Sequence, residues 1–113
     1  MNMRKVFDFS NRVIVITGAA GLLGSEYADG FCQAGGNVVL ADKNFEKCKK
    51  LAAKLEKKYG VKPLPIKLDV TNPNSIKKMV AHITKKCSKI DVLVNNVIFP
   101  EIGKIKKTKF EDF

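Results

Sequence analysis

The chain has 113 residues, of which 45% are hydrophobic, and its formal net charge at pH 7 is +10. This length allows one domain with a core of its own, which buries roughly two-thirds of the unfolded surface. No N-terminal segment has the apolar core of a signal peptide and no apolar run approaches the ~20 residues of a membrane span, so we expect a cytoplasmic protein.

The first predicted strand, residues 13–17, leads directly into three glycines spaced by three, Gly18, Gly21 and Gly24. Glycines permit a tight turn and a close approach of the backbone to a pyrophosphate, and the N–H groups that open the next helix carry a partial positive charge. The spacing differs from the Gly-x-Gly-x-x-Gly fingerprint, so a glycine-rich turn without a ligand is the alternative. The pattern predicts a phosphate cradle for a dinucleotide.

A helical pattern over residues 22–34 follows and is closed by Gly35 and Gly36, and a second strand is predicted over residues 37–41. Its next residue, Asp42, comes 24 residues after Gly18. This is close to the roughly 20-residue spacing at which an acid after the second strand binds ribose hydroxyls. Because a carboxylate repels a 2′-phosphate, we expect NAD to be the cofactor in preference to NADP.

A lysine-rich helix is predicted over residues 44–59, where basic and apolar residues interleave with a 3.6-residue rhythm. We interpret these lysines as a solvated helix face, with an anionic surface or a nucleic acid as the less favoured explanation of the charge. The lysines concerned are Lys47, Lys49, Lys50, Lys54, Lys57 and Lys58. A second basic cluster consists of Lys104, Lys106, Lys107 and Lys109, and its role is open.

The remaining pattern predicts strands over 65–68 and 91–95, separated by a helix over 73–88 that Thr71 or Asn72 caps. Repeated βαβ units with right-handed crossovers give a parallel sheet between two layers of helices, with strand order 3-2-1-4. We therefore expect one α/β domain, residues 1–113, with a Rossmann-type, partial doubly wound sheet. Residues 97–113 lose periodicity and are expected to form an irregular tail.

The cysteines and the single histidine give no sign of a metal site or of nucleophilic chemistry. Cys32, Cys48 and Cys87 are widely spaced and fall on the apolar sides of helical patterns, as expected of core residues in a reducing compartment. His82 has no second ligand or base at a meaningful spacing, so we expect it on a helix surface.

Together with two later motifs, the cradle resembles the N-terminal part of the short-chain dehydrogenase/reductase family, from about Val6 to Asn96. Leu68-Asp69-Val70 is similar to the family's Asp-Val pair, where the acid approaches the adenine amino group. The run from Asp91 to Asn96 resembles its Asn-Asn-Ala-Gly strand end, whose first Asn steadies the central sheet. The sequence motifs and this resemblance together predict the cofactor-binding residues Thr17, Gly18, Ala20, Gly21, Leu22, Leu23, Gly24, Asp42, Asp69, Val70, Asn95 and Asn96.

The sequence departs from the family pattern at two places, one in the cradle and one after the two asparagines. Compact members have a glycine where this chain has Leu22, and Gly21 instead matches the larger, extended members. The Ala-Gly that normally follows the two asparagines is Val97-Ile98, which places bulk where the nicotinamide ribose would approach.

The resemblance implies an oxidoreductase that transfers a hydride between a nicotinamide and an alcohol or carbonyl. The family's catalytic Ser and Tyr-x-x-x-Lys have no counterpart here, because neither Tyr27 nor Tyr59 has a Lys four positions on. We therefore expect the chain alone to be inactive, with the second half of the sheet missing and the fourth strand open to self-association or a partner chain. The alternative is a non-catalytic module that binds a nucleotide or pairs with a partner.

Overall fold

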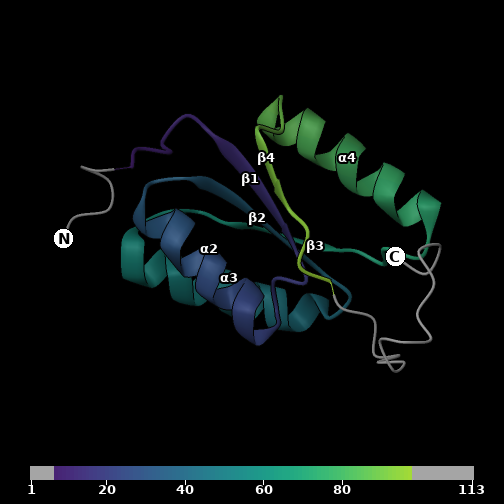
Figure 1. The fold of residues 1–113 in the computed structure, drawn as a ribbon, viewed down its shortest axis with the longest axis horizontal. Helices are drawn as coiled ribbons and strands as arrows, with labels where there is room; N and C mark the ends of the chain where they lie inside the picture. Colours follow the sequence, from purple (N-terminus) through teal and green to yellow (C-terminus); the bar gives the residue numbers. More distant parts are fainter. Residues whose placement is uncertain (1–6, 98–113) are drawn as a thin grey trace, which may run out of the picture.

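The computed structural model describes residues 7–97, and these form a four-stranded parallel sheet of order β3-β2-β1-β4 (Figure 1). The α/β class and the strand order predicted from the sequence are confirmed. In chain order the elements are β1 (Val13–Thr17), α2 (Leu22–Gln33), β2 (Asn37–Asp42), α3 (Phe45–Tyr59), β3 (Leu64–Lys67), α4 (Pro73–Cys87) and β4 (Val92–Val94).

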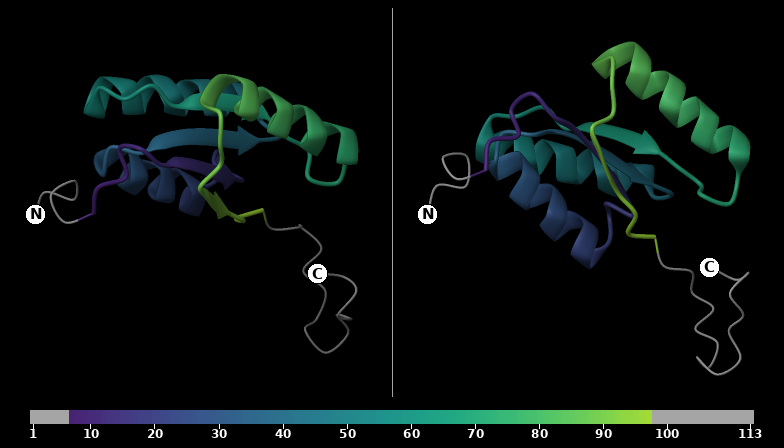
Figure 2. Two further views of the ribbon diagram at one scale, coloured as in Figure 1. Left: turned by 90° about the horizontal axis from the view of Figure 1, so that it is seen from above. Right: turned by 45° about the horizontal axis from the view of Figure 1, so that its top comes forward.

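The two central strands are apolar on both faces because helices cover both faces. Ile14 and Ile16 of β1 belong to the core beneath α2 and α3, whereas Val13 and Val15 belong to the core beneath α4. Figure 1 and the right-hand view of Figure 2 show α2 and α3 on one side of the strands and α4 on the other. An uninterrupted apolar strand is typical of a parallel sheet enclosed in this way.

The ends of the helices follow the sequence signals closely. The side chain of Asn44 caps α3 by accepting a hydrogen bond from the Lys47 N–H, and Asn72, not Thr71, caps α4. After α2 the backbone turns at Gly35, whose φ of +84° is open to glycine but rare for other residues.

The outermost strand β4 is shorter than the predicted span of 91–95. The side chain of Asp91 accepts a hydrogen bond from the Val13 N–H before the strand begins, and the N–H of Asn96 donates to Thr17 Oγ1 after it ends. Hydrogen bonds that involve side chains thus hold both ends of this strand to β1.

Two of the three cysteines lie in the core, as predicted. Cys32 and Cys48 are buried, Cys87 is partly buried, and all three thiols are free. Burial raises the pKa of the Cys32 thiol to about 12, with a further contribution from Asp29, and raises that of Cys48 to about 12, with a contribution from Asp42. Because the thiolate is the reactive form, these two cysteines act as small apolar residues.

Candidate functional site

A hollow of about 490 Å³ lies at the carboxyl ends of the strands, where the strand order reverses. This is the position at which doubly wound sheets bind ligands. Its lining consists of Gly18, Gly21, Leu22, Leu23, Ala41, Asp42, Lys43, Leu68, Asp69, Val70, Thr71, Asn96 and Val97. Segments from the ends of all four strands therefore meet in one cavity of a size typical of small-molecule sites.

The glycines of the cradle have different structural roles. Gly18 has a φ of +66°, and a Cβ there would stand 2.7 Å from the carbonyl oxygen of Asn96. A Cβ on Gly24 would stand 2.2 Å from the carbonyl oxygen of Gly18, so α2 packs directly on the turn. At Gly21 the nearest atom to a Cβ would be 3.4 Å away, which is ordinary contact. Gly18 and Gly24 are thus required by the fold itself, and Gly21 leaves open space beside the hollow.

The N-terminus of α2 fits an anion. Its N-cap is Gly21, which offers no side-chain cap, and its first turn contains no acidic residue. The helices α3 and α4 are both capped by asparagine, so α2 differs from them in leaving the N–H groups of its first turn without a side-chain acceptor. These donors and the helix dipole suit a phosphate group at the hollow.

Asp42 lines the hollow at the end of β2, where two backbone donors hold its carboxylate. Its Oδ2 accepts from the N–H of Ala20 at 3.1 Å, and its Oδ1 accepts from the N–H of Asn44 at 2.8 Å. The carboxylate therefore joins the cradle to the turn that follows β2, and it faces the hollow together with Lys43. A ligand that extends from α2 towards β2 would meet this carboxylate.

Asp69 also lines the hollow, beside Val70. Its Oδ1 accepts from the backbone N–H of Thr71 at 3.0 Å and from the Thr71 hydroxyl at 2.6 Å. Hydrogen bonds from the Thr71 side chain and then its backbone lower the pKa of Asp69, and the nearby charge of Lys43 acts in the same direction. The carboxylate is thus fixed in its ionised form at the rim.

Asn96 connects the end of β4 to the turn of the cradle. Its N–H donates to Thr17 Oγ1 at 3.1 Å, its Nδ2 donates to the Gly18 carbonyl at 3.4 Å, and it lines the hollow. The Thr17 hydroxyl in turn donates to the Val94 carbonyl at 3.3 Å. Thr17 and Asn96 therefore lock the end of β4 to the turn of the cradle, while Asn95 is exposed.

Eight of the twelve predicted residues line the hollow, and four stand behind or beside it. Thr17 and Gly24 are buried supports, Ala20 donates to Asp42, and Asn95 is exposed outside the lining. The lining residues not predicted as cofactor-binding are Ala41, Lys43, Leu68, Thr71 and Val97. Each of them neighbours a predicted residue in the sequence, so predicted segments widened by one residue on each side would have included them.

Val97 brings bulk to the hollow, in agreement with the departure noted in the sequence. Its side chain is 39% exposed and forms part of the lining. Ile98 and the lysines after residue 100 lie outside the described residues.

The described residues outside this hollow match neither the pattern of metal ligands nor that of membrane-spanning helices. Between residues 7 and 97, no three His, Cys, Asp or Glu side chains are grouped so that they could hold a metal ion. His82 is exposed on α4, as predicted. Over the same residues, no helix is long and apolar enough to cross a membrane.

Comparison with known proteins places this geometry in context. The family model described as short chain dehydrogenase matches residues 12–113. The 7alpha-hydroxysteroid dehydrogenase of Bacteroides fragilis is 39% identical over 89 residues, which are 79% of this chain and 34% of that protein. The meso-2,3-butanediol dehydrogenase of Serratia marcescens is 35% identical over 93% of this chain and 41% of its own length.

The fold is also found in solved structures. L-sorbose reductase from Gluconobacter frateurii, complexed with NADPH and L-sorbose, superposes with a TM-score of 0.81 at 28% identity, over 99% of this chain and 41% of that one. The chain thus spans about a third to two-fifths of the length of these relatives. A family model that covers nearly the whole sequence, a matching strand order and a glycine cradle at the switch point lead to one conclusion: the chain belongs to the short-chain dehydrogenase family.

Proposed function

We propose that this chain is the nucleotide-binding unit of an NAD(P)-dependent oxidoreductase that transfers a hydride between a nicotinamide and an alcohol or carbonyl. The observation that carries the proposal is the uncapped N-terminus of α2, which borders a hollow that Asp42 also lines. The pyrophosphate would lie against the first turn of α2, and Asp42 would accept hydrogen bonds from the adenosine ribose. Asp69 would face the adenine.

We further propose that NAD(H) binds more tightly than NADP(H). A 2′-phosphate about 4 Å from the Asp42 carboxylate would be repelled by about 4 kcal/mol for each unit charge at an effective dielectric near 20. Lys43 lines the same hollow and opposes this preference. The L-sorbose reductase that shares the fold is complexed with NADPH, so the balance between Asp42 and Lys43 is the quantity to measure.

Isothermal titration calorimetry with both cofactors tests the proposal. We expect tighter binding of NADH than of NADPH, and we expect Asp42→Ala to narrow the difference because the repelling carboxylate is gone. Glu56→Ala is a matched control, since it removes an exposed carboxylate of α3 away from the hollow. Equal affinities that Asp42→Ala does not change would refute the NAD preference, and no binding of either cofactor would refute the site.

We propose that the 113 residues alone bind the cofactor without turnover. Proton transfer to a carbonyl oxygen needs a positioned acid, and neither tyrosine of the sequence is followed by a lysine at the family spacing. Substrate-dependent oxidation of NADH by the purified chain would contradict this. The free thiols fit a reducing compartment, and the cytoplasm is our proposed location.

A second candidate function is a module that pairs with a partner chain, and the outer edge of β4, which pairs with no other strand within residues 7–97, favours it. One experiment distinguishes the two functions. If the chain shows activity only after addition of a second chain that carries the rest of the family's sheet, the second function is supported.

A further inference from the structure

The lysines of this chain are concentrated on one part of the fold. Residues 43–86, which contain α3, β3 and α4, have thirteen lysines and three acidic residues. The other described residues, 7–42 and 87–97, have two basic and five acidic residues. Only two of the thirteen lysines, Lys49 and Lys58, form ion pairs with described residues. The segment of residues 43–86 therefore carries a large positive charge that ion pairs among the described residues do not neutralise.

These lysines fall into two groups, of which only one surrounds a concave surface. Along α3, Lys50, Lys54 and Lys57 are exposed and line none of the hollows around β3. Around β3, two further hollows of about 620 and 260 Å³ share Phe45 and Lys67 in their linings. The first of them also includes Lys43, which links it to the cofactor hollow.

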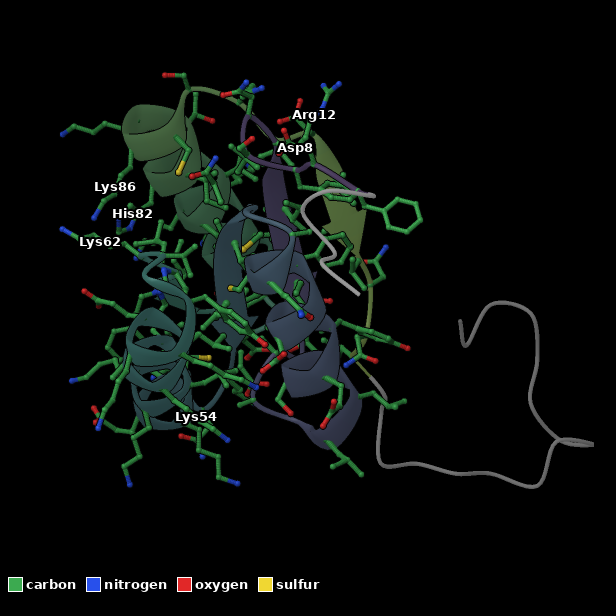
Figure 3. The ribbon with its side chains drawn as sticks, turned by 90° about the vertical axis from the view of Figure 1, so that its left-hand side faces the viewer. Asp8, Arg12, Lys54, Lys62, His82 and Lys86 are labelled. Carbon is green, nitrogen blue, oxygen red and sulfur yellow. The ribbon has the colours of Figure 1, made fainter. Side chains whose placement is uncertain are left out.

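Helix α4 adds a straight basic row to the second group. Lys78 and His82 line the smaller hollow, and Lys86 follows at the same four-residue spacing, about 6 Å per step along a helix. Figure 3 shows Lys62, His82 and Lys86 pointing to the same side of the molecule, with Lys54 apart from them in this view. We name Lys43, Lys62, Lys67, Lys78, His82 and Lys86 the β3 basic surface; all six are exposed.

The chemistry of the surface distinguishes between anionic partners. A folded protein partner would be expected to meet an apolar or aromatic centre, but Phe45 is half-buried beneath Lys49, and the exposed Ile76 and Val80 lie outside these hollows. An added peptide strand is disfavoured because Pro65 lacks an N–H on the outer strand. Single-stranded nucleic acid would require exposed aromatic stacking platforms, but Phe45, the one aromatic residue among the described residues that line these hollows, is half-buried with Lys49 over its ring.

We propose that the β3 basic surface binds the phosphate backbone of a nucleic-acid duplex without reading its sequence. Lysine suits this role because its ammonium group acts as a point charge that attracts phosphate. The described part of the surface has no arginine, the residue that forms bidentate hydrogen bonds to base edges. This binding is separate from the proposed cofactor function, with Lys43 the one residue that borders both sites.

The test measures how the affinity of the full chain for a fluorescein-labelled DNA duplex of mixed sequence depends on salt. Five lysine contacts predict a slope of about −4.5 in log K against log salt, which is roughly a 500-fold loss of affinity between about 50 and 200 mM salt. Fluorescence anisotropy gives the affinities. Absence of binding at about 50 mM salt would overturn the proposal, as would tighter binding to polyglutamate or to anionic lipid vesicles than to the duplex.

Two charge-matched variants separate this surface from net charge alone. Combining Lys62→Gln, Lys78→Gln and Lys86→Gln should reduce the slope by about 3, so that the same salt change costs roughly tenfold. Combining Lys50→Gln, Lys54→Gln and Lys57→Gln removes the same charge from α3 and should change the slope by less than one. All six positions are exposed, and matching thermal midpoints would verify the fold. Equal effects of the two variants would overturn the proposal.

Discussion

Gly24 is the clearest case in which one missing side chain determines the site. Helix α2 lies so close to the turn after β1 that a Cβ on Gly24 would stand 2.8 Å from the Cα of Ala19, in addition to its clash with the Gly18 carbonyl. Both obstacles are backbone atoms, which cannot swing away. The close packing keeps the first turn of α2 at the edge of the hollow, which Leu22 and Leu23 line.

We predict that Gly24→Ala lowers the free energy of unfolding by about 1–3 kcal/mol, the usual cost of forcing extra volume into a packed site. Gly30→Ala is the matched control: it lies in the same helix, and a Cβ there has no atom within 4 Å. The control should gain about 0.5–1 kcal/mol, because alanine favours helix over glycine. Urea unfolding of both variants provides the measurement, and equal stabilities would contradict the packing argument.

At the scale of single residues, the sequence predicts which types of residue stand at the site better than it predicts which contacts their side chains make. Gly18, Asp42 and Asp69 were found because turns and strand ends constrain which residues stand there. The contacts of Asn96 with Thr17 and Gly18 were not predictable, since they depend on where β4 stops relative to Thr17. That relation is a contact between distant segments and leaves no local pattern.

At the scale of elements, β4 is attached to β1 by a small charged cluster at its start. The Asp91 carboxylate accepts from the Val13 N–H at 2.8 Å and forms ion pairs with Lys89 at 3.1 Å and with Arg12 at 3.7 Å. The N–H of Asp91 also donates to the Val13 carbonyl. The hydrogen bond from Val13, followed by that from Lys89, lowers the pKa of Asp91.

This lowered pKa predicts how stability depends on pH. An aspartate in the unfolded chain has a pKa of about 3.9, so the unfolded state binds the proton first as the pH falls. The contribution of Asp91 is therefore complete above that value and is lost as the pH drops through its folded pKa. We expect Asp91→Asn to lower stability at neutral pH and to flatten the loss of stability below about pH 4.

Circular dichroism during acid titration and urea unfolding measures both effects. Glu46→Gln is the control, because its carboxylate is exposed and, among the described residues, pairs with Lys49 of the same helix. A pH profile of Asp91→Asn that runs parallel to the wild type would show that Asp91 contributes nothing to the attachment of β4.

The helices and inner strands were predictable because caps, glycines and periodicity are local, as Asn44 and Gly35 illustrate. The outer strand β4 was predicted two residues too long, since only tertiary contacts decide where an edge strand leaves its ladder.

For the whole molecule, the two edges of the sheet differ in how they are protected. The outer strand β3 contains Pro65 and Lys67, and both residue types discourage pairing with another strand. The outer strand β4 consists of Val92, Leu93 and Val94 and contains neither. Figure 2 shows β4 along the margin of the fold with α4 set back from it.

The exposed face beside β4 is apolar as well. Leu93 pairs in register with Val15, whose side chain belongs to the core beneath α4, yet Leu93 itself is 54% exposed. Ile76 and Val80 of α4 are 38% and 42% exposed. The sequence alone could not show this, because apolar residues in a short strand are ordinarily assigned to the core, and exposure here depends on how far α4 reaches across the sheet.

We therefore predict that the chain self-associates as its concentration rises, through β4 and the side chains beside it. Leu93→Lys should shift the protein towards the monomer with little loss of stability, because a half-exposed lysine can reach solvent and a charge opposes edge pairing. Gln33→Lys adds the same charge at an exposed position of α2 and should leave association unchanged. Light scattering over a wide range of concentrations distinguishes the two variants. A compact monomer at high concentration, with the β4 amides strongly protected from hydrogen exchange, would mean that another part of this chain already covers the edge.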